Sequence, residues 1–203
     1  MPTDAELLES WRAGDARAGN TLLERHVDAL IRFFDTKASE AVDDLVQRTL
    51  LACVVHRDRV RDAASFRGFL FAVARNELFD HYKGQARQAG FDPATSAVTD
   101  MAPSPSAALA ADDTRGAIMA ALQQIPVELQ IALELHYWED LSTAELGDAL
   151  GIPQGTVKSR LRRAKELLRA RMDASATPNR GESGDAEREL DAWAAAVGLR
   201  ARQ

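Results

Sequence analysis

Four polar side chains near residue 160 have the types and spacing of groups that contact DNA. A stripe of apolar residues runs from Val157 to Leu168 at helical spacing, so the opposite side of that helix faces outward. Arginine and lysine pair with O6 and N7 of guanine, and serine contacts a base edge or a phosphate. The outward residues that we expect to contact DNA are Lys158, Ser159, Arg162 and Arg163.

The segment before this helix carries the local signals of a helix-turn-helix. Ser142 and Glu145 form a capping box that opens a short helix ending at Leu150. Gly151 stands where a left-handed residue ends a helix, and Pro153 presets φ for the next one. Such a turn, followed by an outward cationic face, is typical of a recognition helix in the major groove. The alternative is an ordinary amphipathic helix with a solvated basic face.

Charge is distributed unevenly along the chain. The 203 residues carry a formal net charge of −6, yet residues 156–171 contain seven Lys and Arg against Glu166 alone. A local basic face in an acidic protein suits selective contact with DNA better than indiscriminate coating of it.

Side chains that could carry enzymatic chemistry do not form a recognisable constellation. The four histidines, His26, His56, His81 and His136, lack the spacing of metal ligands, and no phosphate-binding glycine loop or nucleophile elbow is present. The single cysteine, Cys53, lies on an apolar stripe, which favours a buried inert thiol over a redox sensor. We therefore expect no enzymatic activity, no metal and no cofactor.

The composition is that of a soluble protein with real cores, 46% hydrophobic and 28% charged. No apolar stretch reaches the length that crosses a bilayer, and the N-terminus lacks the pattern of a signal peptide. We expect a cytoplasmic protein without membrane insertion.

Helical periodicity recurs along the chain, and no stretch alternates with the period of a strand, so the expected fold class is all-α. The first helix should begin at the capping box Thr3–Glu6 and stop near Gly14. Three more are expected over about 15–36, 41–55 and 66–83, which together form one compact domain over residues 1–87. On the second of these we expect an inward face of Leu22, Leu23, Val27, Leu30, Ile31 and Phe34.

The remainder of the chain divides into three parts. Residues 88–113 hold three prolines, many small residues and no helical stripe, which predicts a flexible linker. A second small helical domain follows over 114–172. Residues 173–203 form a tether and a short C-terminal helix with Trp193 on its apolar face, which either packs on the protein's own surface or docks reversibly as a restraint.

Two segments in this order resemble a known family, the extracytoplasmic-function class of bacterial sigma factors. The stretch 122–172, with its Gly-Thr-Val-Lys-Ser-Arg-Leu-Arg-Arg run, is similar to sigma region 4, which in the family recognises the −35 promoter element and contacts the polymerase β flap. Residues 43–50 are similar to the helix of region 2 that binds core polymerase at the β′ coiled coil. Residues 66–81 are similar to the helix that recognises the −10 element.

The resemblance implies a transcription initiation factor whose partners are core RNA polymerase, promoter DNA and an anti-sigma factor, or in its place self-inhibition by the C-terminal helix. We expect polymerase to contact the residues of the third helix that lie off its buried stripe, and −10 DNA to contact polar residues of the fourth. The polymerase-binding set is Asp43, Asp44, Gln47, Arg48 and Leu51. The −10 set is Arg75, Asn76, Asp80 and Lys83, of which a merely solvated helix face is a close alternative.

The sequence departs from the family at several positions. Arg48 stands where the family usually has an acidic residue, and Val54 where it has an aromatic one. Ala72 and Val73 replace the tryptophan pair of housekeeping sigma factors, which implies weaker melting and a base held in a pocket near the loop before Phe66. The competing hypothesis is an autonomous helix-turn-helix regulator that uses residues 1–87 for dimerisation or ligand sensing.

Overall fold

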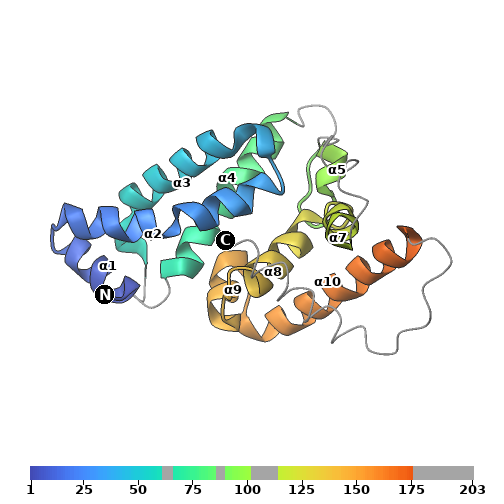
Figure 1. Cartoon of the computed structure of the whole chain (residues 1–203). Coiled ribbons are helices and arrows are strands. Elements are labelled where there is room, and N and C mark those ends of the chain that lie inside the picture. The colour runs from blue at the N-terminus through green and yellow to red at the C-terminus, as the bar shows by residue number, and fades with distance from the viewer. Residues whose placement is uncertain (61–65, 86–89, 102–113, 176–203) are drawn as a thin grey trace. The chain divides into compact units, whose positions relative to one another are not determined.

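The computed structural model describes residues 1–60, 66–85, 90–101 and 114–175. Every regular element in these ranges is a helix, which confirms the all-α prediction (Figure 1). Contacts along the chain group residues 1–81 with 141–154 into one compact unit, and residues 82–140 with the chain from Gly155 onward into another.

The first unit is built on α2 (Ala16–Asp35), against which both α1 (Asp4–Arg12) and α3 (Val42–His56) pack. The approach of α1 is close, because a Cβ on Gly19 of α2 would lie 2.5 Å from the indole of Trp11. Only glycine fits beneath that ring. The unit also contains most of the long helix α4 (Phe66–Gln85), and one-turn 3₁₀ helices η1 (Ser39–Ala41) and η2 (Arg57–Arg59) flank α3.

Helix starts in this unit follow the expected capping chemistry. The hydroxyl of Thr3 accepts from the backbone N–H of Glu6 at 3.3 Å, and the Glu6 carboxylate accepts from the backbone N–H of Thr3 at 2.7 Å. These bonds lower the pKa of the Glu6 carboxyl. Asp15 caps α2 by accepting from the N–H groups of Arg17 and Ala18. Both caps satisfy N–H groups that a helix leaves without partners.

The core of this unit is aromatic and aliphatic, and one predicted member is wrong. Ile31 was expected to face inward, but it is 41% exposed, and Phe33 at 3% takes its place beside Phe34. The rings of Phe33 and Phe71 lie 5.7 Å apart, so the buried face of α2 is set by α4 as well as by its own periodicity. The largest fully buried side chains of α2 and α4 are Leu22, Leu30, Phe34, Phe66, Leu70, Phe71, Leu78 and Tyr82.

The described part of the second half contains α5 (Val98–Met101), α7 (Thr114–Leu122), α8 (Val127–Tyr137), α9 (Thr143–Leu150) and α10 (Gln154–Ser175). Helix α8 is buried along most of its length, including Ile131, Ala132 and Leu135. One boundary between the two compact units falls between Gln154 and Gly155, at the start of α10.

Part of the segment expected to be a flexible linker is folded. Residues 91–101 contain α5, and Ala97 and Val98 are buried. The backbone explains why. Pro126, at the N-cap of α8, supplies no side-chain cap, and the carbonyls of Ser96 and Pro93 accept from the N–H groups of Val127 at 2.9 Å and Glu128 at 3.2 Å. The segment thereby satisfies donors that α8 would otherwise leave unpaired.

Two further predictions concern the ends of elements. Helix α10 continues past the expected end at Met172 to Ser175. The tether and C-terminal helix predicted beyond it, including Trp193, lie outside the described residues. Among the helices in the described ranges, none is both long enough and apolar enough to cross a bilayer.

Candidate nucleic-acid and partner interfaces

The turn that precedes α10 has the geometry that its sequence predicts. The hydroxyl of Ser142 accepts from the N–H of Glu145 at 3.2 Å, and the Glu145 carboxylate accepts from the N–H of Ser142 at 2.8 Å. Gly151 has φ +66°, the left-handed conformation that costs glycine nothing. The N–H of Ile152 then donates to the carbonyl of Gly147 at 3.0 Å, which closes the turn.

Helix α10 separates an apolar stripe from a cationic face. The stripe of Val157, Leu161, Ala164 and Leu168 is buried, with exposures from 0% to 8%, as predicted. All four residues expected to contact DNA are exposed: Lys158, Ser159, Arg162 and Arg163. The hydroxyl of Ser159 donates to the carbonyl of Thr156 at 2.8 Å, which leaves its oxygen able to accept from a ligand.

The basic residues of α10 divide into inward and outward groups. Arg160 is paired with Glu128 of α8, and Lys165 lies 5.2 Å from the ring centroid of Tyr137. Arg162, by contrast, is 79% exposed, and its Nε lies 3.8 Å from the carboxylate of Glu166 one turn along. Exposed pairs of this kind contribute little to stability, so the Arg162 guanidinium can exchange partners at small cost.

The outward side of α3 presents charge at its beginning and apolar groups at its end. Asp43, Asp44 and Gln47 are exposed, and Leu51 is 58% exposed. Val54 at 39% and Val55 at 72% extend the apolar part, although neither was among the predicted contact residues. The signal was present in the sequence, because positions 51, 54 and 55 all fall off the buried stripe of Leu45, Val46, Thr49 and Cys53.

Arg48 has a different environment from the rest of the predicted polymerase-binding set. Its Nη2 lies 2.6 Å from the carboxylate of Glu77 on α4, and its Nη1 lies 3.7 Å from that of Asp44. The side chain is 42% exposed, so it borders the outward face of α3 while joining α3 to α4. The family's usual acidic residue could not make this pair.

Three of the four residues predicted to contact −10 DNA share one exposed stripe of α4. Asn76, Asp80 and Lys83 follow i, i+4, i+7 spacing, and all are exposed. Arg75 is half-buried, with its guanidinium carbon 4.8 Å from the ring centroid of Phe79. The pocket expected before Phe66 falls mostly on residues outside the described ranges.

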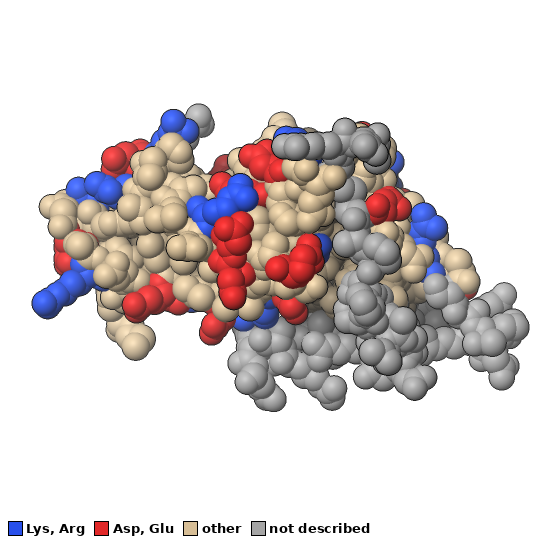
Figure 2. Space-filling view, turned by 90° about the horizontal axis from the view of Figure 1, so that it is seen from above, with Lys and Arg blue, Asp and Glu red and all other residues tan. Residues whose placement is uncertain are grey.

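Two further observations concern the single cysteine and the charge on one face of the molecule. Burial raises the pKa of the Cys53 thiol to about 12, which keeps it protonated and unreactive at neutral pH. On the face of the molecule in Figure 2, Lys and Arg side chains are interspersed with Asp and Glu rather than gathered into a field of one sign.

Two known protein families match the chain, one in each half. The Sigma-70 region 2 family matches residues 22–88, and the Sigma-70 region 4 family matches residues 115–168. The ECF RNA polymerase sigma factor SigL of Mycobacterium tuberculosis is 32% identical over 160 residues, which cover 77% of this chain and 90% of the relative. The RNA polymerase sigma-H factor of Pseudomonas aeruginosa is 28% identical over 178 residues, which cover 81% and 91%.

Two solved structures with a similar fold are complexes with a second protein. CnrH in complex with the cytosolic domain of CnrY has a TM-score of 0.61 at 24% identity, covering 85% of this chain and 99% of that one. The sigma factor RpoE of Bartonella quintana, in complex with the anti-sigma factor NepR, has a TM-score of 0.57 at 21% identity, covering 77% and 98%.

Proposed function

The chain belongs to the extracytoplasmic-function class of RNA polymerase sigma factors, transcription initiation factors that direct the polymerase to promoters, and we propose that two of its surfaces contact promoter DNA while a third contacts core polymerase. Residues 1–87 act as the region 2 domain, residues 114–172 as the region 4 domain, and the segment between them as the connection. The chemistry of RNA synthesis belongs to the polymerase, so the sigma factor needs no catalytic group, and it acts in the cytoplasm.

The −35 element is read by α10. The observation that carries this assignment is the exposed set Lys158, Ser159, Arg162 and Arg163 above a buried stripe, directly after the left-handed turn at Gly151. Two arginines one residue apart can reach neighbouring bases, while Lys158 and Ser159 lie nearer the helix start and suit a phosphate or a base edge. Arg160, paired with Glu128, has a structural role instead.

The −10 element is contacted by the exposed stripe of α4. Asn76 can pair with an adenine edge, Lys83 can neutralise a phosphate, and Asp80 can accept from the amino group of cytosine. Arg75 lies beside this stripe against Phe79, where it could stack on an unpaired base. Because Ala72 and Val73 are small, melting must depend more on capturing one base than on wedging the duplex open.

Core polymerase is bound by the outward side of α3. The charged residues Asp43 and Asp44 lie at the start of α3, and the exposed apolar residues Leu51, Val54 and Val55 lie toward its end. Protein interfaces combine an apolar centre with a polar rim, so this face suits a partner helix such as the β′ coiled coil. Neighbouring exposed apolar side chains of this kind are a feature of surfaces that bind other proteins. The β flap is the proposed partner of the region 4 domain.

An anti-sigma factor is the third proposed partner. Its support is the fold shared with RpoE, whose structure is a complex with the anti-sigma factor NepR. Such a partner would compete with polymerase if it covered the apolar patch of α3. Self-inhibition by the C-terminal helix is the alternative to a separate anti-sigma factor.

One experiment separates a sigma factor from an autonomous regulator. Promoter DNA is titrated with the protein alone, with core polymerase alone, and with both, and transcription is measured in parallel. We expect weak binding by the protein alone, and tight binding with initiation at a defined start when both are present. Tight, specific binding by the protein alone, unchanged by core polymerase, would contradict the proposal.

A further inference from the structure

One guanidinium joins the helix assigned to core polymerase to the helix assigned to −10 DNA. Nη2 of Arg48 on α3 lies 2.6 Å from Oε2 of Glu77 on α4, and Nη1 lies 3.7 Å from the carboxylate of Asp44, one turn earlier on α3. The side chain of Asp44 is 66% exposed and belongs to the polymerase-binding face, whereas that of Glu77 is 20% exposed. Arg48 is therefore shared between a carboxylate on a binding surface and a carboxylate that is mostly covered.

The pair between Arg48 and Glu77 is close, but its hydrogen-bond geometry is poor. Oε2 of Glu77 is buried and, within the described residues, accepts no hydrogen bond, although Nη2 of Arg48 lies 2.6 Å away. A carboxylate gains most from a cation that also donates an aligned hydrogen bond. Asp44 attracts the same guanidinium toward the outer side of α3, which opposes that alignment. The pair can therefore strengthen when Asp44 is neutralised.

Glu77 lies beside the proposed −10 contacts. It follows Asn76 directly and precedes Asp80 by three residues, and both of these side chains are exposed. One turn after Glu77, Nε2 of His81 lies 3.6 Å from the carboxylate of Glu40 on η1. Contacts at two successive turns fix the rotation of α4 about its own axis, and with it the direction in which Asn76 and Asp80 point.

The polymerase-binding face is acidic at the point where Arg48 reaches it. Glu40, Asp43 and Asp44 help to line a hollow of about 330 Å³ at the start of α3. Complementary charge across an interface favours a lysine or arginine of the partner at this point. Such a cation pairs with Asp44 and repels the neighbouring guanidinium of Arg48. Both effects move Arg48 toward Glu77.

We propose that Arg48 links the two surfaces: core polymerase takes Asp44, the guanidinium transfers fully to Glu77, and α4 is held in the orientation that reads the −10 element. The inference deepens the proposed function and rests on it. Neither Arg48 nor Glu77 touches DNA in this scheme, so both are positioning residues. Because linkage is reciprocal, −10 DNA raises the affinity for polymerase by the factor by which polymerase raises the preference for the −10 element.

The test measures a −10 preference, the ratio of affinities for two labelled DNAs that carry an intact or a substituted −10 element and no −35 element. The preference is determined for the full-length protein alone, at high concentration, and with core polymerase. The second value divided by the first is the coupling factor. Wild type, Arg48→Ala, Glu77→Gln and the charge swap of Arg48→Glu with Glu77→Arg are compared, each well below its unfolding midpoint.

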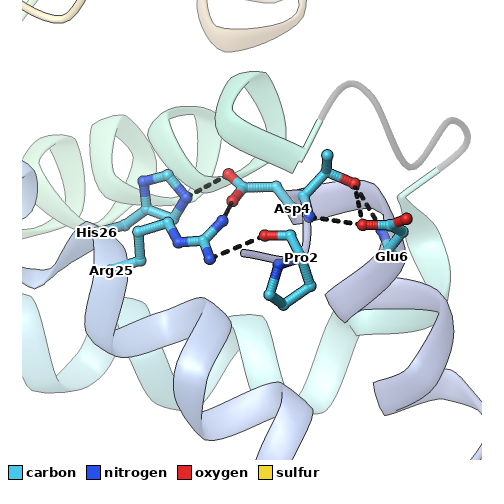
Figure 3. A network of polar contacts seen from close by, with 6 residues as sticks. Pro2, Asp4, Glu6, Arg25 and His26 are labelled. Carbon is cyan, nitrogen blue, oxygen red and sulfur yellow. Dashed lines mark hydrogen bonds and ion pairs between the residues drawn. The ribbon is translucent and has the colours of Figure 1, made fainter.

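The matched control is Arg25→Ala. Arg25 pairs with Asp4 at 2.5 Å and donates to the carbonyl of Pro2 at 3.0 Å, in a network that joins α1 to α2 (Figure 3). Its pair is 34% and 23% exposed, close to the 42% and 20% of the Arg48–Glu77 pair. The control therefore removes an ion pair of similar length and exposure from the same compact unit, but from neither assigned surface.

We expect Arg48→Ala and Glu77→Gln to lower the coupling factor by about two- to fivefold, the range of a partly exposed ion pair. The charge swap should regain stability, because the pair is restored with its charges exchanged. It should not regain the coupling factor, since a cation of polymerase would now attract the acidic side chain at position 48 away from position 77. Arg25→Ala should keep the wild-type factor.

A coupling factor equal to wild type in both Arg48→Ala and Glu77→Gln would overturn the inference, and so would an equal loss in Arg25→Ala. A charge swap that regains stability and the coupling factor together would also overturn it, because a purely structural pair behaves in that way. If the wild-type −10 preference is the same with and without polymerase, the inference fails and the proposed function stands. If the complete complex has no −10 preference, the proposed −10 function fails and the inference fails with it.

Discussion

Arg48 of α3 and Glu77 of α4 form an ion pair in which Nη2 of the arginine lies 2.6 Å from the carboxylate. The pair joins the helix that we assign to polymerase to the helix that we assign to −10 DNA. It also accounts for the departure of Arg48 from the acidic residue usual in the family. A basic residue is favoured at position 48 because its neighbours, Glu77 and Asp44, are both acidic.

The first prediction follows from that pair. Arg48→Glu places three carboxylates together and should lower the free energy of unfolding by about 1 kcal/mol, since the partners are 42% and 20% exposed and the pair is partly screened. Adding Glu77→Arg should recover most of the loss. Urea unfolding of the wild type, the two single variants and the double variant measures the coupling free energy between positions 48 and 77. Additive effects would show that the two side chains do not interact.

The second prediction concerns −35 reading. Arg162→Ala and Arg163→Ala should each cost about 1–3 kcal/mol of discrimination between intact and scrambled −35 elements if the side chain contacts a base edge. Arg169→Ala is the matched control, because it removes an exposed arginine two turns further along α10. Arg160→Ala should lower stability instead, through Glu128. An undiminished −35 preference in both test variants would remove these arginines from the site.

The third prediction concerns the polymerase-binding face. Asp44→Lys with Gln47→Ala should weaken binding to core polymerase while the protein stays folded, and Val55→Asp should weaken it further, since Val55 is 72% exposed. Ile31→Asp is the matched control, because it changes an exposed apolar residue of another helix, α2. Titration against core polymerase measures the affinity, with circular dichroism to check folding. Wild-type affinity in the α3 variants would place the interface elsewhere.

Local chemistry made much of this architecture predictable. The capping boxes at Thr3 and Ser142, the left-handed Gly151 and the buried stripe of α10 depend on residues within a few positions of one another, which the sequence displays directly. The misplacement of Ile31 has a different origin. Its exposure depends on how α4 packs against α2, and periodicity within one helix does not contain that information.

The unpredicted contacts join residues far apart in the sequence. Arg48 and Glu77 are 29 positions apart, and the carbonyl of Ser96 accepts from the N–H of Val127 across 31. Composition also misled at residues 91–101, because prolines and small residues are typical of linkers. Here the backbone carbonyls of Pro93 and Ser96 accept hydrogen bonds from the first N–H groups of α8. Of the exposed apolar residues of α3, Leu51 was predicted as a contact, Val54 was named only as a departure from the family, and Val55 was not considered.

The fourth prediction is a pH dependence of stability. Burial lowers the pKa of His26 below its ordinary value, although the carboxylate of Asp4 opposes the shift and Arg67 and Arg25 add to it. The unfolded chain therefore takes up a proton near pH 6.5 that the folded protein takes up only at lower pH. Stability should be full above about pH 6.5 and fall as the pH drops below it.

Thermal unfolding between pH 7.5 and 5.5 measures this effect. His26→Gln should flatten that limb of the profile, while His56→Gln, at the half-exposed end of α3, controls for the loss of a histidine. A profile that is unchanged in His26→Gln would show that other groups carry the pH dependence.

The last prediction concerns the segment docked on α8. From the end of α4 at Gln85 to Phe91 the chain spans at most about 20 Å, at roughly 3.3 Å per residue. Promoter elements two helical turns apart are separated by about 70 Å, and two domains of about 30 Å each reach that far only when they lie in line with a nearly extended connection. We therefore expect residues 91–101 to leave α8 when both elements are bound at once.

A disulfide across the Ala97–Pro126 bridge tests this requirement. Residues paired across strands have Cα atoms about 4.5–5.5 Å apart, within the range of a disulfide, so Ala97→Cys with Pro126→Cys should lock the segment on α8. Cys53, buried and with its thiol pKa raised to about 12, should not compete. The oxidised protein should bind core polymerase and −35 DNA normally but fail to initiate where both elements are needed, and reductant should restore initiation. Each single cysteine variant controls for the substitutions. Normal initiation by the oxidised double variant would mean that the segment stays docked and that the connection reaches both elements by another route.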